Sequence, residues 1–125
     1  VRRVYSDITQ MLSDEFNPTP LVRLNRVTGF KHAELYAKLE WCNPFGSVKD
    51  RVAANLIMDA EERGFIRPET QLVEPTSGNT GLGLVMMANT RGLPLTVPIS
   101  TRVPAEKRNA LKLMGAKLIE LDDEL

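Results

Sequence analysis

One lysine stands out in this sequence because of the pattern around it. Residues 43–51 read NPFGSVKDR, a turn that leads into a helix and places Lys49 at its start. Ser47 followed by Asp50 three residues later is the pattern of a capping box, so we expect Ser47 to be the N-cap. On a helical wheel, Lys49 lies in the middle of the apolar half. A lysine is rarely buried without a reason, so this position needs an explanation.

The same wheel predicts which face of the helix is buried. The apolar half consists of Val48, Val52, Ala53, Leu56, Ile57 and Ala60. The polar half consists of Asp50, Arg51, Asn55, Glu61 and Glu62. The positive end of the helix dipole and apolar neighbours would both lower the pKa of Lys49, leaving a nucleophilic amine suited to a Schiff base. The alternative is a solvated Lys49 whose stem lies over Val52 and Ala53, and spacing alone favours neither.

A second turn, residues 76–81 (TSGNTG), is dense in hydroxyl groups and glycine and also opens a helix. Free backbone N–H groups, the helix dipole and short donors make a site for a carboxylate or phosphate. The alternative is a capped helix start, but six such residues exceed what a cap needs, so we favour an anion site. The segment is not a P-loop, and Gly81 and Gly83 lack the third glycine of the dinucleotide fingerprint.

Composition and charge argue against several classes of function. The 16 basic residues balance 16 acidic ones, so nothing in the net charge indicates nucleic acid or an anionic membrane. No apolar run approaches a membrane span, and no signal-peptide pattern follows the first residues. Cys42, the only cysteine, is expected to be a small apolar side chain in a reducing, cytoplasmic setting. His32 is expected to be incidental, and metal-ligand spacings are absent from the sequence.

Strands alternate with helices along the chain. The expected strands are residues 21–24, 33–40, 71–74, 95–99 and 117–121. The expected helices are a short one at 6–16, one from the capping box to Gly64, one through 82–88 closed by Gly92, and one from Pro104 to Gly115. This order predicts an α/β fold, a parallel βαβ sheet with helices packed on it, in one domain over residues 1–125. Residues 122–125 follow the last strand at once, so the chain looks truncated before its next helix.

The two turns together resemble a known family. Residues 43–51, followed after an appropriate gap by residues 74–81 (EPTSGNTG), are similar to the motifs of the cysteine synthase family. That family belongs to the β-family (fold type II) of pyridoxal-phosphate enzymes and has cystathionine β-synthase as a near relative. Supporting matches follow in the same order at residues 19–24, 38–40, 106–108 and 115–116. The resemblance covers nearly the whole chain and implies the amino-terminal part of such an enzyme.

The resemblance implies a role for each residue of the two turns. Lys49 would hold pyridoxal 5′-phosphate as a Schiff base and then move protons at the substrate Cα. Asn79 would hydrogen-bond the ring hydroxyl of the cofactor. The substrate α-carboxylate would be bound by Thr76, Ser77, Gly78 and Thr80. The implied reaction is β-replacement, in which O-acetylserine or O-phosphoserine reacts with sulfide through an aminoacrylate intermediate to give cysteine.

Two departures limit what the resemblance implies. The family's phosphate cradle and the serine that meets the pyridine nitrogen have no counterpart in these 125 residues, and residues 100–104 differ from the typical form. We therefore expect the isolated chain to be inactive without the second half of such an enzyme, which would be a homodimer. Within the family, the alternative is a cystathionine β-synthase-type enzyme using serine with homocysteine, or another β-family lyase. The alternative of another class is a non-catalytic anion-binding or interaction module.

Overall fold

The computed structural model describes residues 4–27, 29 and 31–122. In chain order its elements, with η marking a 3₁₀ helix, are η1 (Ile8–Met11), β1 (Leu21–Arg23), β2 (Tyr36–Lys38), η2 (Glu40–Cys42), α1 (Lys49–Glu62), β3 (Leu72–Val73), α2 (Asn79–Arg91), β4 (Leu95–Ser100), α3 (Ala105–Leu113) and β5 (Lys117–Leu121). The predicted order of strands and helices is confirmed, although several elements are shorter than expected. The domain predicted over residues 1–125 has both of its ends outside the described residues.

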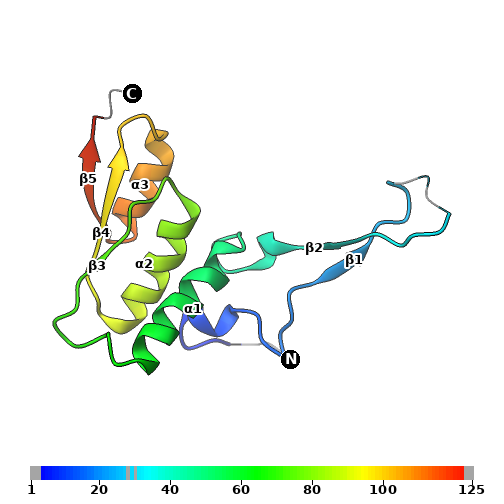
Figure 1. Ribbon diagram of the computed structural model, residues 1–125, viewed down its shortest axis with the longest axis horizontal. Coiled ribbons are helices and arrows are strands. Elements are labelled where there is room, and N and C mark those ends of the chain that lie inside the picture. The colour runs from blue at the N-terminus through cyan, green and yellow to red at the C-terminus, as the bar shows by residue number, and fades with distance from the viewer. Residues whose placement is uncertain (1–3, 28, 30, 123–125) are drawn as a thin grey trace.

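Three strands form a parallel sheet with β4 in the centre (Figure 1). Leu72 of β3 pairs with Leu95 of β4, and Thr96 of β4 pairs with Lys117 of β5. Helices α2 and α3 connect successive strands, so the sheet is built from two βαβ units. The predicted α/β fold with a parallel sheet is therefore confirmed.

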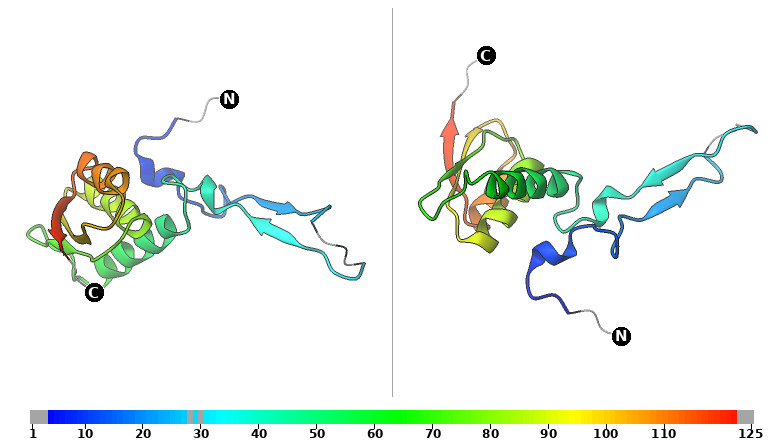
Figure 2. Two further views of the ribbon diagram at one scale, coloured as in Figure 1. Left: turned by 90° about the horizontal axis from the view of Figure 1, so that it is seen from above. Right: turned by 60° about the horizontal axis from the view of Figure 1, so that its bottom comes forward.

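Strands β1 and β2 pair with each other and lie outside the parallel sheet. Val22 is opposite Ala37 in a two-stranded antiparallel ladder, which the bond from the Leu24 N–H to the Leu35 carbonyl oxygen extends. The ribbon projects away from the helices in every view (Figures 1 and 2). Alternating sequence patterns identify both segments as strands, but the patterns do not say which strands become partners.

The core lies where α2 packs between α1 and β4. The segment from Leu84 to Ala88 is buried almost completely, which confirms the prediction that this apolar helix is covered on several sides. Strand β4 alternates buried and half-buried residues, with Leu95, Val97 and Ile99 inside. Leu111 of α3 is fully buried and completes the same core.

Helix α1 buries only part of the face that the wheel predicted, with Ala53 and Ile57 inside as expected. Its buried residues are Asp50, Ala53, Ala54 and Ile57. Val52 and Leu56, expected inside, are 38% and 53% exposed, whereas Asp50, expected on the polar half, is fully buried. The wheel identifies the apolar face, but the contact with α2 at Gly83 decides which face is covered.

The only cysteine and the histidine expected to be incidental both lie on the surface. Cys42 is exposed and Trp41 beside it is 69% exposed, so the expectation that the cysteine packs as a small apolar side chain is wrong. His32 is exposed in the connection between β1 and β2. Within residues 4–27, 29 and 31–122, no helix is long and apolar enough to cross a bilayer.

Candidate functional site

The turn before α1 brings Lys49 to the first position of the helix. Gly46 has φ +79°, a left-handed conformation that residues with a Cβ rarely adopt. The Ser47 hydroxyl oxygen accepts a hydrogen bond from the N–H of Lys49 at 3.1 Å. The predicted capping box is wrong in its first position, because Val48 and not Ser47 is the N-cap. Ser47 therefore stabilises the helix start from the position that precedes the N-cap, and not from the N-cap itself.

The Asp50 carboxyl group is buried in this turn. Its Oδ2 atom accepts a hydrogen bond from the N–H of Phe45 at 2.7 Å, while its Oδ1 atom is buried and has no partner among the described residues. Burial raises the pKa of Asp50, against the backbone N–H groups of Phe45 and Ser47, which lower it. Sequence reasoning missed this environment, since it placed Asp50 on the polar half of the helix.

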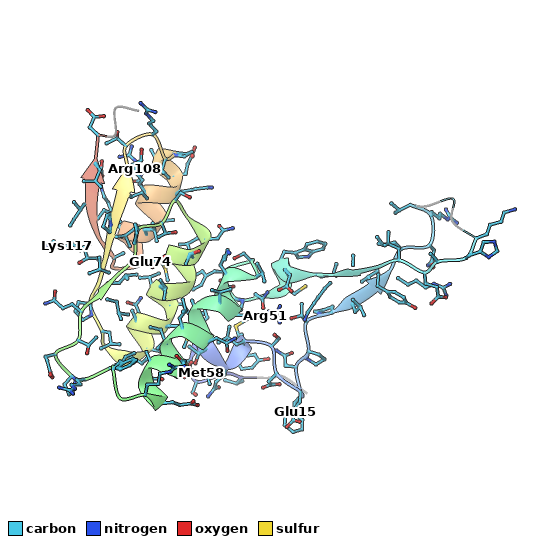
Figure 3. The ribbon with its side chains drawn as sticks, viewed as in Figure 1. Glu15, Arg51, Met58, Glu74, Arg108 and Lys117 are labelled. Atoms are coloured by element: carbon cyan, nitrogen blue, oxygen red, sulfur yellow. The ribbon has the colours of Figure 1, made fainter. Side chains whose placement is uncertain are left out.

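A second set of polar contacts holds the same turn to η2. The Asn43 side-chain amide donates to the Glu40 carbonyl oxygen at 2.7 Å and to the Glu40 carboxylate at 2.9 Å. The other carboxylate oxygen of Glu40 accepts from Arg51, also at 2.9 Å. Figure 3 shows Arg51 at the amino end of α1, beside η2. The segment before Lys49 is thus tied to the two helix residues that follow it, Asp50 and Arg51.

Lys49 is exposed, although the wheel places it in the middle of the apolar half of the helix. In the part of the chain that the structure describes, no carboxylate forms an ion pair with its amine. The amine is accessible to a ligand. The sequence left open whether Lys49 has apolar neighbours or is solvated at the helix start, and the structure is closer to the solvated alternative.

The second predicted turn connects β3 to α2. The Thr76 hydroxyl oxygen accepts a hydrogen bond from the N–H of Gly78 at 3.3 Å, and α2 begins at Asn79. Gly78 is buried beneath Lys107 of α3, since a Cβ at Gly78 would lie 3.4 Å from the Lys107 Cδ atom and 3.6 Å from its Nζ atom. Ser77 and Asn79 are exposed. The loop therefore presents hydroxyl, amide and N–H groups next to a cation that the sequence pattern did not reveal.

Helices α1 and α2 run in the same direction and bring the two turns together. Near their amino ends, a Cβ on Gly83 would lie 2.9 Å from the Lys49 carbonyl oxygen. Near their carboxyl ends, Arg91 and Glu61 form a bidentate ion pair. Residues 76–80 lie directly before this contact in α2, so the lysine and the loop share one end of the helix pair. The positive ends of both dipoles point to that end.

A shallow cavity of about 310 Å³ lies at the carboxyl ends of β4 and β5. Thr76 and Ser77 line it together with Ser100 and Val103. This is the edge where open α/β sheets bind ligands. Neither Lys49 nor Asn79 lines this cavity, so the six predicted residues meet at one end of the molecule without sharing a single enclosed pocket.

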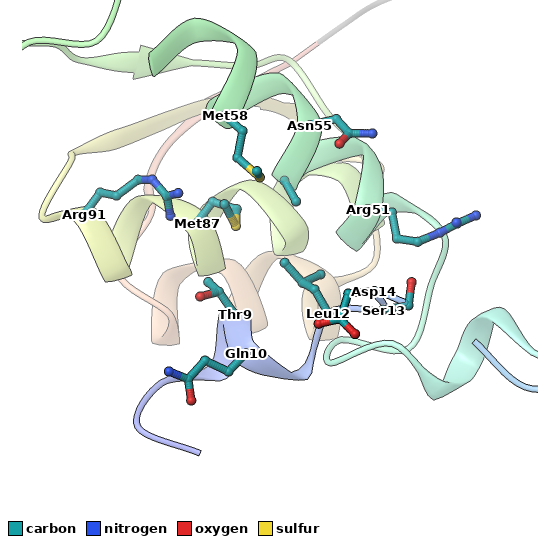
Figure 4. A pocket seen from close by; sticks show the side chains of 11 residues that line it. Thr9, Gln10, Leu12, Ser13, Asp14, Arg51, Asn55, Met58, Met87 and Arg91 are labelled. Carbon is teal, nitrogen blue, oxygen red and sulfur yellow. The ribbon is translucent and has the colours of Figure 1, made fainter. Parts of the chain in front are cut away.

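A larger groove of about 420 Å³ separates η1 from α1 and α2 (Figure 4). Leu12, Met58 and Met87 supply its apolar wall. Its charged groups already have protein partners: Arg91 pairs with Glu61, Arg51 pairs with Glu40, and the Asp14 carboxylate accepts from the N–H groups of Phe16 and Asn17. The groove lies away from residues 76–80, and none of the predicted site residues lines it. Across the described residues, no group of three or more His, Cys, Asp or Glu side chains could hold a metal ion.

Comparisons with known proteins identify the family to which the two turns point. Residues 12–125 match the family model described as pyridoxal-phosphate dependent enzyme. A probable cysteine synthase from Bacillus subtilis (strain 168) is 45% identical over 107 residues, which are 86% of this chain and 34% of that protein. Cysteine synthase A from Escherichia coli (strain K12) is 48% identical over 101 residues, 81% of this chain and 30% of that protein.

A cystathionine beta-synthase from Apis mellifera is 42% identical over 124 residues, 94% of this chain and 24% of that protein. Solved structures agree in fold. The crystal structure of cysteine synthase from Entamoeba histolytica has a TM-score of 0.86 at 33% identity, over 97% of this chain and 36% of that one. A hydrogen sulfide-producing enzyme from Fusobacterium nucleatum has a TM-score of 0.84 at 32% identity, over 98% of this chain and 39% of that one. The chain spans a quarter to a third of the length of the curated relatives it matches.

Proposed function

Since the chain belongs to the family of pyridoxal-phosphate dependent enzymes, we propose that it takes part in a β-replacement reaction in which an activated serine reacts with sulfide to give cysteine. The activated serine is O-acetylserine or O-phosphoserine. The observation that carries the proposal is the position of Lys49 and residues 76–80 at the same end of two parallel helices. Relatives named cysteine synthase support this reaction class, and the cystathionine beta-synthase relative keeps serine with homocysteine as the alternative.

The residues at this end of the helix pair fit a pyridoxal group. An aldehyde needs an accessible amine, and Lys49 is exposed without an ion pair to any described carboxylate. Asn79 is exposed at the first position of α2 and could hydrogen-bond a ring hydroxyl. When bound, pyridoxal phosphate supplies an electron sink for the bonds at the substrate Cα.

The chain's own groups would bind the substrate and move its protons. The loop of Thr76, Ser77, Gly78 and Thr80 would bind the α-carboxylate through its hydroxyl groups, at the positive end of the α2 dipole. Lys107 beside Gly78 would add a positive charge to the same site. Lys49 would hold the cofactor through Nζ and, when released, would carry a proton to or from the substrate Cα.

Reductive trapping tests the proposed role of Lys49. The chain is incubated with pyridoxal phosphate, treated with borohydride, digested and mapped by mass spectrometry. We expect most of the attached pyridoxal on Lys49, and a Lys49→Ala variant should lose this product and the associated visible absorbance. Lys117→Ala, which removes an exposed lysine of β5 far from α1, is the matched control and should change neither. Attachment spread evenly over the exposed lysines would show that these 125 residues alone do not direct pyridoxal to Lys49. The same result in a longer chain that includes the phosphate cradle would refute the enzyme proposal and favour a non-catalytic anion-binding module.

Binding of a free carboxylate tests the role of residues 76–80. O-Acetyl-L-serine is added to the pyridoxal-loaded chain and the backbone amide resonances are followed by NMR. We expect shifts concentrated in residues 76–80, and we expect the methyl ester of the same amino acid to shift them less because its carboxylate is blocked. Equal shifts with acid and ester would contradict a carboxylate site. Cysteine formation after sulfide is added then measures whether this chain turns over.

A further inference from the structure

The buried carboxyl group of Asp50 calls for a reason beyond helix capping. An aspartate in the first turn of a helix is favoured by the dipole while it stays solvated. Asp50 is instead 0% exposed, and burial of a carboxyl group is unfavourable unless its oxygens find donors. One of its two oxygens has a donor, the N–H of Phe45 at 2.7 Å, and the other has none among the described residues. A capped helix start does not need so deeply buried a group.

The bond from Phe45 to Asp50 closes the turn onto the helix that follows it. Phe45 precedes Gly46, whose φ of +79° reverses the chain direction, and the Gly46 N–H donates to the Asn43 carbonyl oxygen at 2.8 Å. Without the carboxylate, the Phe45 N–H would be a half-buried donor with no partner. The turn would then be held to α1 by the bond from the Lys49 N–H to the Ser47 hydroxyl and by the Glu40–Arg51 pair, neither of which involves Phe45.

Asp50 also connects the turn to the place where the two helices meet. A Cβ on Gly83 of α2 would lie 3.2 Å from the Asp50 Cα atom and 2.9 Å from the Lys49 carbonyl oxygen. Asp50 thus connects three parts of the chain. Its side chain holds the turn, and its Cα atom lies against α2. Because it is bonded to Lys49, its position also sets where the Lys49 side chain leaves the helix.

We infer that Asp50 is the positioning residue for Lys49: by holding the Phe45 N–H it locks the turn of residues 43–48 to α1 and fixes where the Lys49 side chain leaves the helix, at the end that the helix pair shares with residues 76–80. The inference rests on the proposed function for its purpose, but its structural part does not need the cofactor. Asp50 is fully buried, so it would touch neither the cofactor nor the substrate and would act through the backbone.

Two variants and one control separate this role from simple loss of stability. Asp50→Asn keeps an oxygen that can accept from Phe45, whereas Asp50→Ala removes it. Asp59→Ala, at an exposed position of the same helix where the side chain pairs with Arg63, is the control. Each chain is examined for amide hydrogen exchange by NMR and for the share of borohydride-trapped pyridoxal found on Lys49.

In the unsubstituted chain we expect the Phe45 amide to exchange slowly. Asp50→Ala should speed that exchange about tenfold or more while the β4 amides stay protected, and should lower the Lys49 share of the trapped pyridoxal. Asp50→Asn should restore both readouts, and Asp59→Ala should change neither. A Phe45 amide that exchanges as fast as an open loop in the unsubstituted chain would overturn the inference even if Asp50→Ala does not fold.

Different results would refute the proposed function and the positioning role of Asp50. Pyridoxal that avoids Lys49 in a chain that includes the phosphate cradle would refute the enzyme proposal, and the exchange of Phe45 would still decide whether Asp50 holds the turn. Asp50→Ala chains that remain folded, lose Phe45 protection and still direct pyridoxal to Lys49 as before would refute the positioning role alone.

Discussion

Gly83→Ala tests the contact that places Lys49 beside α2. A methyl group on Gly83 would lie 2.9 Å from both the Ala53 Cβ atom and the Lys49 carbonyl oxygen, against about 3.5–4.0 Å for an unstrained contact. The carbonyl oxygen belongs to the backbone and cannot rotate away, so the helices would have to separate by roughly 0.5–1 Å. Overpacking destabilises by about 1–3 kcal/mol, and alanine is better than glycine in a helix by about 0.5–1 kcal/mol. We therefore expect the free energy of unfolding to fall by about 0.5–2 kcal/mol.

Urea unfolding followed by circular dichroism measures this change. Asn55→Ala, at an exposed position in the middle of α1, is the control for helix propensity and should raise stability by at most about half a kcal/mol. The wider helix spacing should also move Lys49 away from residues 76–80. At equal folded fraction, Gly83→Ala should then trap less pyridoxal on Lys49. A variant as stable as the unsubstituted chain would show that the helices do not meet at Gly83.

Two further predictions concern α3 and β5, which pack together beside the proposed carboxylate loop. Leu111→Ala should lower the free energy of unfolding by about 2–5 kcal/mol because Leu111 is fully buried. The control Leu113→Ala, at an 88% exposed position, should change it by less than about 0.5 kcal/mol. Equal effects of the two substitutions in urea unfolding would contradict the packing of α3. A hydrogen bond from Lys112 and the charge of Arg108 (Figure 3) hold the pKa of Glu120 below its ordinary value of 4.5. A lowered acid pKa stabilises the fold above the unfolded pKa and loses this contribution as pH falls through the folded pKa, so Glu120→Gln should be less stable at neutral pH and the difference should close in strong acid. A difference that persists unchanged into strong acid would refute this account of Glu120.

Elements whose burial and pairing follow from their own residue pattern were predictable from the sequence. The segment 82–88 is apolar on all sides, so any fold that includes it as a helix must bury it, and the structure does. Strand β4 alternates between buried and half-buried positions, and the helix α3 connects it to β5, as expected of a parallel βαβ unit. Gly64, Gly92 and Gly115 take positive φ where the helices end, as their positions after the helical patterns indicated.

Features that depend on a distant partner were not predictable. Helix α1 has more than one plausible inner face, and the choice was made by the close approach at Gly83, which brought Asp50 inside and left Val52 outside. The separate pairing of β1 with β2 is also a choice of partner, which alternation does not encode. The candidate site shows the same division. Its residues could be named from the two turns, whereas the Lys107 side chain over Gly78 comes from another helix and left no signal in either motif.

The exposed Cys42 makes the chain easy to label at one defined point. It is the only thiol in the sequence, it lies at the end of η2, and the turn that leads to Lys49 begins at the next residue. A maleimide fluorophore or spin label would therefore attach at one atom without any cysteine being removed first. Its anisotropy or line shape would report how tightly that turn is held, which gives a direct optical or magnetic reading of the segment on which the proposed chemistry depends.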